Sequence, residues 1–195
     1  METPNHIPYA MPRIGDLAPD FTAVTTFGNL TFSDWAKDSW VVLFSHPADF
    51  TPVCTTEFLG FSRLHPEFEK LNTQLIGLSI DSVHSHIAWA RSIEANFGVK
   101  VPFPIIADLS MEVSSKYGMI HPGASKTAAV RAVFVIDPEQ NIRAMIYYPL
   151  TTGRVISEVL RLVKALQLNA ETGLATPEGW EPGEACIVPP PATQA

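Results

Sequence analysis

A buried strand that leads directly into a helix is the feature of this sequence that most constrains its fold. Residues 40–45 form an apolar run rich in branched side chains, which is typical of a strand covered on both faces of a sheet. A helix is predicted from Pro52 to about Leu71, because Phe58, Phe61, Leu64 and Phe68 recur at helical spacing. Cys54 lies where the connecting segment meets this helix. In an α/β sheet, ligands usually bind at such a switch from strand to helix.

Strands and helices alternate along most of the remaining chain. Strands are predicted at residues 21–25, 30–32, 74–80, 103–107, 130–136 and 142–148, and helices at 82–96, 112–117 and 155–168. The first two strands are expected to form a hairpin around Phe27-Gly28-Asn29. Asp81 or Ser82 is the expected cap of the helix over 82–96, which places Ile87, Trp89 and Ile93 on or near one face. This order predicts an α/β sandwich built on a mixed sheet.

The two ends of the chain differ in composition from the middle. Residues 1–20 are rich in proline and are expected to be extended. We assign residues 1–168 to one domain and residues 169–195, which hold a run of three prolines, to a C-terminal extension. The extension is interpreted as an arm laid over another surface, such as a partner subunit. For the last five or six residues a frayed tail is an equal alternative.

Composition and charge exclude several classes of protein. The 195 residues are 46% hydrophobic, which is enough for a substantial core, and carry a net charge of −7 without a basic block. Nucleic acids and anionic membrane surfaces reward clustered Lys and Arg, so neither is an expected partner. No apolar run approaches the length of a membrane span, and the N-terminus lacks the pattern of a signal peptide. A cytoplasmic location is therefore expected.

The two cysteines point to reactivity rather than to cross-linking. Two cysteines in a chain of this length do not make a disulfide framework, and they fit a reducing compartment. No second Cys or His lies at ligand spacing from Cys54, so no metal is expected there. The segment His84-x-His86 could bind a metal, but we interpret it as the solvated start of a helix.

The start of the predicted helix is a setting in which a thiolate is favoured. Thr51 is a good N-cap residue, Pro52 is the residue type preferred at the first helical position, and Cys54 falls at the third. The free amides and the positive end of the helix dipole favour a negative charge at this place. A thiolate is a strong nucleophile, so Cys54 is a candidate catalytic residue. The alternative is a small, inert core cysteine.

Three charged residues could complete a site at Cys54. Arg131 lies inside an apolar strand, where its charge is costly unless it is paired. Facing the helix start, it would stabilise the thiolate and offer N–H donors to an oxygen anion. Glu57 follows Cys54 by one turn and would need a cation, for which Arg154 is the best candidate. The alternatives are an Arg131 that points to solvent and a Glu57 and Arg154 that are ordinary surface charges.

With these residues assembled, the chain resembles the peroxiredoxins, and within them the one-cysteine branch. The Pro-x-x-x-Thr-x-x-Cys motif of that family is matched by Pro47, Thr51 and Cys54, and its arginine by Arg131. Further runs typical of the branch occur at residues 44–57, 78–83, 101–106, 148–149, 151–154 and 166–168. The likeness covers about residues 12–190 and implies a thioredoxin-like fold, with a mixed central sheet flanked by helices and a C-terminal extension.

The resemblance implies a thiol-dependent peroxidase that reduces hydrogen peroxide and organic hydroperoxides. The Cys54 thiolate would attack the peroxide and become a sulfenic acid, an outside thiol would reduce it, and no metal or organic cofactor is implied. Thr51 and Arg131 would hold the peroxide oxygens, and Pro47 would shield the sulfur. Glu57 and Arg154 would orient Arg131. His46 would contact the cysteine pocket or, equally, have a structural hydrogen-bonding role. Homodimers or rings of dimers are implied too.

The match to the family fails in two places. Members with two catalytic cysteines carry the resolving cysteine just before a Gly-Trp-x-Pro-Gly segment, whereas Cys186 follows it here, at residues 179–183. Cys186 is therefore displaced from that pattern: it is a candidate resolving cysteine, and the alternative is a passive thiol. Some relatives have a phospholipase activity linked to Gly-x-Ser-x-Gly. Residues 37–41 stand at the place of that segment and lack both of its glycines, and Ser33 stands where those relatives have a histidine. No lipase activity is therefore expected.

Two other functions use the same residues differently. A holdase or redox-signalling protein on the same fold stays open as a second role. A thiol–disulfide oxidoreductase would carry a Cys-x-x-Cys pair, which this sequence lacks.

Overall fold

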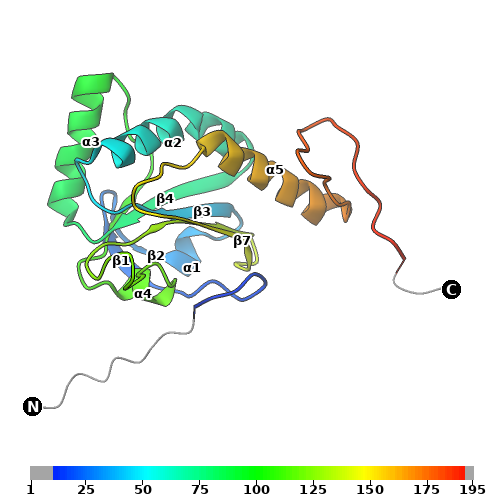
Figure 1. The fold of residues 1–195 in the computed structure, drawn as a ribbon, viewed down its shortest axis with the longest axis horizontal. Helices are drawn as coiled ribbons and strands as arrows, with labels where there is room; N and C mark the ends of the chain where they lie inside the picture. The colour runs from blue at the N-terminus through cyan, green and yellow to red at the C-terminus, as the bar shows by residue number, and fades with distance from the viewer. Residues whose placement is uncertain (1–10, 192–195) are drawn as a thin grey trace, which may run out of the picture. The chain divides into compact units, whose positions relative to one another are not determined.

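The computed structural model describes residues 11–191 and divides the chain into two compact units, Met1–Arg154 and Val155–Ala195. Figure 1 labels most of their helices and strands. The strands are β1 (Thr22–Thr25), β2 (Gly28–Thr31), β3 (Trp40–Ser45), β4 (Thr73–Ser79), β5 (Ile105–Ala107), β6 (Arg131–Ile136) and β7 (Ile142–Tyr148). The helices are α1 (Phe32–Trp35), α2 (Pro52–Lys70), α3 (Val83–Phe97), α4 (Glu112–Lys116) and α5 (Ile156–Thr172).

The first unit is built on a single mixed sheet. Its seven strands are ordered β2-β1-β5-β4-β3-β6-β7. Strand β4 runs parallel to its two neighbours, β3 and β5, and the other pairs are antiparallel. Parallel neighbours need crossover connections, and α2 and α3 supply them. The predicted α/β fold with a mixed sheet is confirmed.

The central strand β3 is buried on both faces, as its composition predicted. Val41 and Leu43 join a large hydrophobic cluster on one face of the sheet. The side chain of Phe44 points to the other face and stacks on Phe61 of α2, with the ring centroids 3.9 Å apart. Figure 1 shows α2 and α3 on this side of the sheet and α1 and α4 on the opposite side. The end of β3 is therefore held between two layers of helices, and packing against the sheet fixes α2, which follows it.

Most predicted elements of this unit are present with shifts of one or two residues. The hairpin turn is one step earlier than predicted, because Thr25 pairs with Gly28 and the turn lies at Thr26 and Phe27. The short helix α1 was not predicted, since four residues are too few to show a helical period. Ser82 is the cap of α3, and its hydroxyl accepts a hydrogen bond from the Ser85 amide at 3.2 Å.

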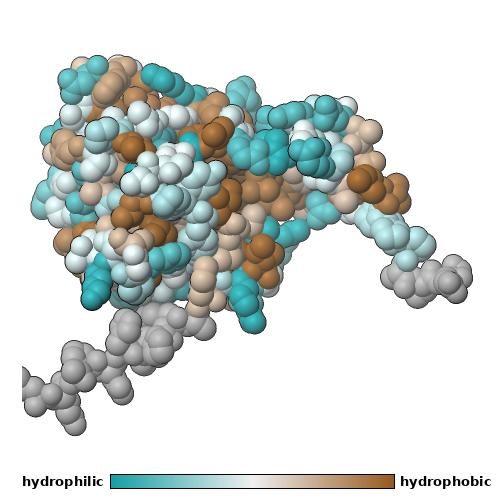
Figure 2. All heavy atoms as spheres, viewed as in Figure 1, coloured by the Kyte–Doolittle hydropathy of each residue, from teal (hydrophilic) through white to brown (hydrophobic). Residues whose placement is uncertain are grey.

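The second unit consists of α5 and an arm that folds back on itself. The helix extends to Thr172, four residues beyond the predicted end, and stops where Gly173 adopts a left-handed φ of 71°. The arm is closed by a bridge between Ala175 and Ile187 around a buried Trp180. The arm also has an apolar end: Ile187 and Val188 are exposed, and Figure 2 shows hydrophobic side chains close to its described end.

Two expectations about the ends of the chain lie partly outside the described residues. Residues 1–10 and 192–195 are not described, so the extended start is tested only from residue 11 and the frayed tail not at all. The boundary at residue 168 stays a prediction, although the division into compact units falls earlier, after Arg154. Among residues 11–191, no helix combines the length and the apolar character that crossing a membrane requires.

Candidate active site

The first turn of α2 positions Cys54. Thr51 is the N-cap residue with extended backbone angles, Pro52 is the first helical residue, and Cys54 is the third. The Thr51 hydroxyl does not cap the helix: it donates to the carbonyl oxygen of Ala48 at 3.0 Å. Phe50, just before the cap, has a φ of 57° and an exposed side chain. The helix thus begins where the sequence predicted, but the backbone N–H groups of its first turn do not donate a hydrogen bond to the Thr51 hydroxyl oxygen.

A guanidinium group lies against the sulfur of Cys54. The thiol is fully buried, at 0% exposure, and Nη1 of Arg131 lies 3.4 Å from its Sγ. Nε and Nη2 of Arg131 donate to the carbonyl oxygen of Leu150 at 3.0 and 2.8 Å, which fixes the plane of the group. A positive charge directed at a buried sulfur stabilises a thiolate there. Arg131 therefore faces the helix start rather than solvent.

Glu57 joins Arg131 to a second arginine. Its carboxylate accepts from Nη1 of Arg131 at 2.7 Å and from Nε and Nη2 of Arg154 at 2.9 and 2.8 Å. All three side chains are buried, so they are not the surface charges of the alternative interpretation. Burial raises the pKa of Glu57, but the hydrogen bonds and charge of Arg154 outweigh it, and the pKa lies below its ordinary value. The carboxylate is therefore ionised and holds both arginines in place.

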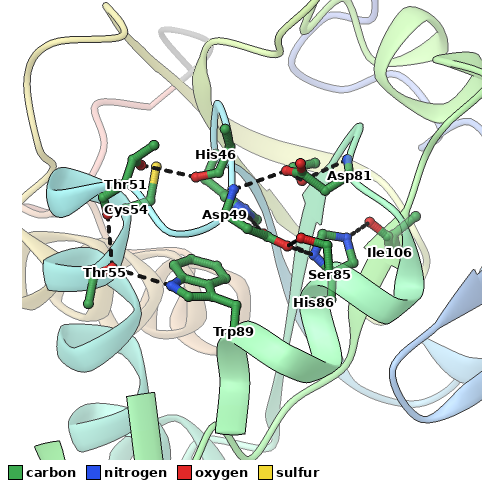
Figure 3. A network of polar contacts seen from close by, with 12 residues as sticks. His46, Asp49, Thr51, Cys54, Thr55, Asp81, Ser85, His86, Trp89 and Ile106 are labelled. Carbon is green, nitrogen blue, oxygen red and sulfur yellow. Dashed lines mark hydrogen bonds and ion pairs between the residues drawn. The ribbon is translucent and has the colours of Figure 1, made fainter. Parts of the chain in front are cut away.

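A second buried network lies beside the same turn. His46 follows β3 directly, and its Nε2 lies 2.9 Å from Oδ1 of Asp49. Nδ1 of His86, from the first turn of α3, lies 2.8 Å from Oδ2 of the same carboxylate. Figure 3 shows this network between the start of α2, with Thr51 and Cys54, and the start of α3. The two helices are thus tied together through one carboxylate.

The ionisation of this network follows from its contacts. Burial raises the pKa of Asp49, but the hydrogen bonds from His46 and His86 outweigh it, so the pKa falls far below its ordinary value. Burial lowers the pKa of His46 by more than the Asp49 hydrogen bond raises it. At neutral pH, Asp49 is therefore a carboxylate and His46 a neutral imidazole.

These three residues are also the cluster that comes closest to a metal site in the described part of the chain. One ligand atom each from His46, Asp49 and His86 lies within 4.8 Å of the other two. The same nitrogen and oxygen atoms already pair with one another in hydrogen bonds. The three side chains are thus held by hydrogen bonds to one another, and Nδ1 of His46 has no hydrogen-bond partner among the described residues.

Sequence reasoning identified part of this site and missed part. Cys54, Thr51, Arg131, Glu57 and Arg154 are brought together as expected, and Pro47 is half-buried in the loop that precedes the cap. Cys186 lies in the other unit, where its Sγ contacts the carbonyl oxygen of Glu184 at 3.8 Å.

The interpretation of His86 as solvated was wrong, because its side chain is fully buried. The spacing of apolar residues in the sequence did indicate that His86 is buried. His86 precedes Trp89 by three residues and Ile93 by seven, and these three residues form the buried face of α3. Ile87 is only partly buried. Asp49 was overlooked because nothing adjacent in the sequence marks it as paired.

Comparison with known proteins finds families and relatives that are similar to this chain. The AhpC/TSA family profile matches residues 14–145, and that of the C-terminal domain of 1-Cys peroxiredoxin matches residues 165–195. A peroxiredoxin of Aquifex aeolicus is 58% identical over 194 residues, covering 94% of this chain and 87% of the relative. A peroxiredoxin of Methanosarcina mazei is also 58% identical, with coverage of 94% and 86%.

Solved structures show the same fold. The C45S mutant of peroxiredoxin 6 from Arenicola marina superposes with a TM-score of 0.85 at 43% identity, covering 91% of this chain and 84% of that one. A yeast mitochondrial 1-Cys peroxiredoxin, studied for resolution of its thiol through glutathione and thioredoxin systems, gives a TM-score of 0.85 at 47% identity. The coverage there is 92% of this chain and 87% of the other.

Proposed function

This chain belongs to the peroxiredoxins, the thiol-dependent peroxidases, and from this we propose that Cys54 is its peroxidatic cysteine. The observation that carries the proposal is the contact of 3.4 Å between Arg131 Nη1 and the buried Cys54 Sγ at the start of α2. The enzyme is an oxidoreductase with an antioxidant function. Hydrogen peroxide and organic hydroperoxides are its substrates.

The first step is an attack by the Cys54 thiolate on the terminal oxygen of the peroxide. An S–O bond forms while the O–O bond breaks, so the sulfur is oxidised to a sulfenic acid and the leaving oxygen departs as an alkoxide or hydroxide. That oxygen takes a proton and leaves as alcohol or water. The N–H donors of Arg131 and the hydroxyl of Thr51 hold the two oxygens in line and stabilise the developing charge.

The supporting residues keep these donors in place. Glu57 and Arg154 orient Arg131 from behind, through the buried carboxylate that both arginines contact. Pro47 has no N–H to donate and shields the sulfur from water on the loop side. His46 starts the loop that leads into α2, and its hydrogen bond to Asp49 supports a structural role in that loop.

An outside thiol completes the cycle. It attacks the sulfenic sulfur, releases water and forms a mixed disulfide, which a further thiol reduces. Two features support this proposal: Cys186 does not have the position of a resolving cysteine in the sequence, and the yeast relative is resolved through glutathione and thioredoxin systems. In this proposal Cys186 is a passive thiol.

Two variants test the assignment of the cysteines. We expect Cys54→Ser to abolish peroxide turnover with a thiol reductant and Cys186→Ser to retain it. Mass spectrometry after one equivalent of peroxide should give a mono-oxygenated Cys54 in the second variant. Turnover retained by Cys54→Ser would refute the assignment, and a disulfide between positions 54 and 186 in the unmodified chain would establish a two-cysteine cycle instead.

Assembly and location are proposed on family grounds. Likeness to the family supports a homodimer or a ring of dimers in the cytoplasm. Sedimentation velocity over a range of concentrations tests the assembly, and a monomer at every concentration would contradict it.

A further inference from the structure

The backbone of residues 150–154, between β7 and α5, contacts two members of the buried charge cluster. The carbonyl oxygen of Leu150 accepts from Nε and Nη2 of Arg131 at 3.0 and 2.8 Å. At the other end of the segment, the backbone N–H of Arg154 donates to Oε1 of Glu57 at 2.8 Å. The segment therefore holds both residues through backbone groups, in addition to the side chain of Arg154.

These contacts decide which N–H group of Arg131 is left for a substrate. A guanidinium group with its Nε carries five N–H donors. Nη1 donates to Oε2 of Glu57 and to Sγ of Cys54. The carbonyl of Leu150 takes the N–H of Nε and one N–H of Nη2. In the described part of the chain, one N–H of Nη2 therefore has no hydrogen-bond partner and is available to an oxygen of the peroxide.

The segment 150–154 lies close to the first turn of α2 at a residue that has no side chain. A Cβ added at Gly153 would lie 3.3 Å from Cγ1 of Val53, the residue before Cys54. Carbon atoms in contact prefer about 3.5–4.0 Å, so a methyl group there would push the two chains apart. Val53 cannot easily turn away, because a branched side chain in a helix has one strongly preferred rotamer. Gly153 does not have a positive φ, so the close approach, and not the backbone angle, calls for glycine here.

An added methyl group at this contact would disturb the site whichever chain yields. If the segment moves, the carbonyl of Leu150 moves with it. If the start of α2 moves instead, Cys54 moves with Val53. Both displacements change the contact of 3.4 Å between Nη1 of Arg131 and the sulfur.

We infer that Gly153 is a positioning residue, which lets the segment 150–154 lie against Val53 and so aligns the Leu150 carbonyl that fixes the plane of Arg131 at Cys54. The inference rests on the proposed function, because it concerns the donor that Arg131 offers to the peroxide. Having no side chain, Gly153 acts through this carbonyl.

Gly153→Ala, in the full chain with Cys186→Ser, tests the inference. Stopped-flow measurement gives the rate constant for oxidation of Cys54 by hydrogen peroxide. A misplacement of about 1 Å can cost about 10²-fold in rate, so a shift of a few tenths of an ångström should cost about tenfold.

The second measurement on this variant is the pH dependence of the ultraviolet absorbance of the Cys54 thiolate, with the profile of Cys54→Ser subtracted. We expect the titration to move to higher pH, because a displaced guanidinium stabilises the thiolate less. An unchanged rate constant or an unchanged titration would overturn the inference.

Val53→Ala should rescue the variant by removing the methyl group that Gly153→Ala would contact. We expect the double variant Val53→Ala/Gly153→Ala to match Val53→Ala, its reference, in both rate constant and titration. A double variant that keeps the full loss seen in Gly153→Ala would refute the steric explanation.

Gly123→Ala is the matched control, because this exposed glycine also lacks a positive φ and a Cβ there meets nothing within 4 Å. We expect it to keep the rate constant of the parent protein, and a tenfold loss there would contradict the inference. Thermal unfolding checks that each variant is folded. Gly153 is exposed, so Gly153→Ala should fold. If only the double variant folded, the contact would serve stability rather than alignment, and the inference would fail.

The parent protein separates the two proposals. If peroxide left its Cys54 unmodified, both the proposed function and this inference would fail. A parent protein that turns over peroxide and a Gly153→Ala variant that does so equally fast would refute the inference alone.

Discussion

At the scale of single residues, the charge of Glu57 is important for stability, because it pairs with two buried guanidinium groups. Glu57→Gln keeps the shape but leaves Arg131 and Arg154 without their common anion. Breaking a buried ion pair in this way costs about 3–5 kcal/mol. We expect urea unfolding to show a loss of that size, together with a loss of peroxidase activity.

Glu112→Gln is the matched control for that measurement. Its carboxylate also pairs with a cation, Lys116, but its side chain is 58% exposed. Exposed pairs contribute little, so we expect a change within about 0.5 kcal/mol. Equal losses in the two variants would show that burial of the Glu57 cluster has no special importance.

Acid should destabilise the protein through the same buried groups. The pKa of His46 is lowered from 6.5 by burial, so its unfolded form binds protons first and stability falls as pH drops below about 6.5. The pKa of Glu57 also lies below its ordinary value of 4.5, because Arg154 outweighs burial. Its contribution is complete above about pH 4.5 and is lost as pH falls through the folded-state pKa.

Unfolding free energies measured by urea titration from about pH 8 to about pH 3 test this prediction. We expect a progressive decline with acidification. The curve for Glu57→Gln should be flatter below about pH 4.5, because glutamine does not titrate. A variant curve parallel to that of the parent protein would contradict the role of this carboxylate.

At the scale of elements, the end of α3 depends on a left-handed residue. Gly98 is the C-cap with a φ of 65°, and its amide donates to the carbonyl of Glu94 at 2.9 Å. A side chain there finds open space but disfavours this conformation. We expect Gly98→Ala to lower the unfolding free energy by about 1 kcal/mol, and thermal unfolding to occur about 2–4 °C lower.

Gly123→Ala controls for the addition of a methyl group. This glycine does not have a positive φ, and a Cβ there also meets nothing within 4 Å. We expect its melting temperature to stay at or slightly above that of the parent chain. If both variants lost the same stability, the backbone angle at Gly98 would not be the cause.

At the scale of the whole molecule, a bulky thiol reagent and a small peroxide should react with different cysteines of the folded protein. Cys54 is fully buried in the first unit, and Cys186 is partly exposed in the second. We expect a bulky maleimide to label Cys186 in the folded protein and both cysteines in urea, while one equivalent of peroxide oxidises Cys54. Peptide mass spectrometry measures both reactions, and rapid maleimide labelling of Cys54 in the folded state would contradict the burial of the sulfur.

The sequence alone determined the features that depend on neighbouring residues. The helix start at Thr51, Pro52 and Cys54 was predictable because capping is decided within a few residues. The buried strand β3 was predictable because its apolar run is continuous. The family motif added the roles expected of Arg131 and Glu57, which local patterns left open between a buried and a solvent-facing position.

Only the tertiary structure decided which distant side chains meet. Arg131 and Cys54 are 77 residues apart in sequence, and Arg154 and Glu57 are 97 apart. His86 and Asp49, 37 residues apart, were not predicted to pair at all. Such contacts depend on strand order and on the packing of α3 against the sheet, and the cost of burying charge selects the partners only once the fold has brought them together.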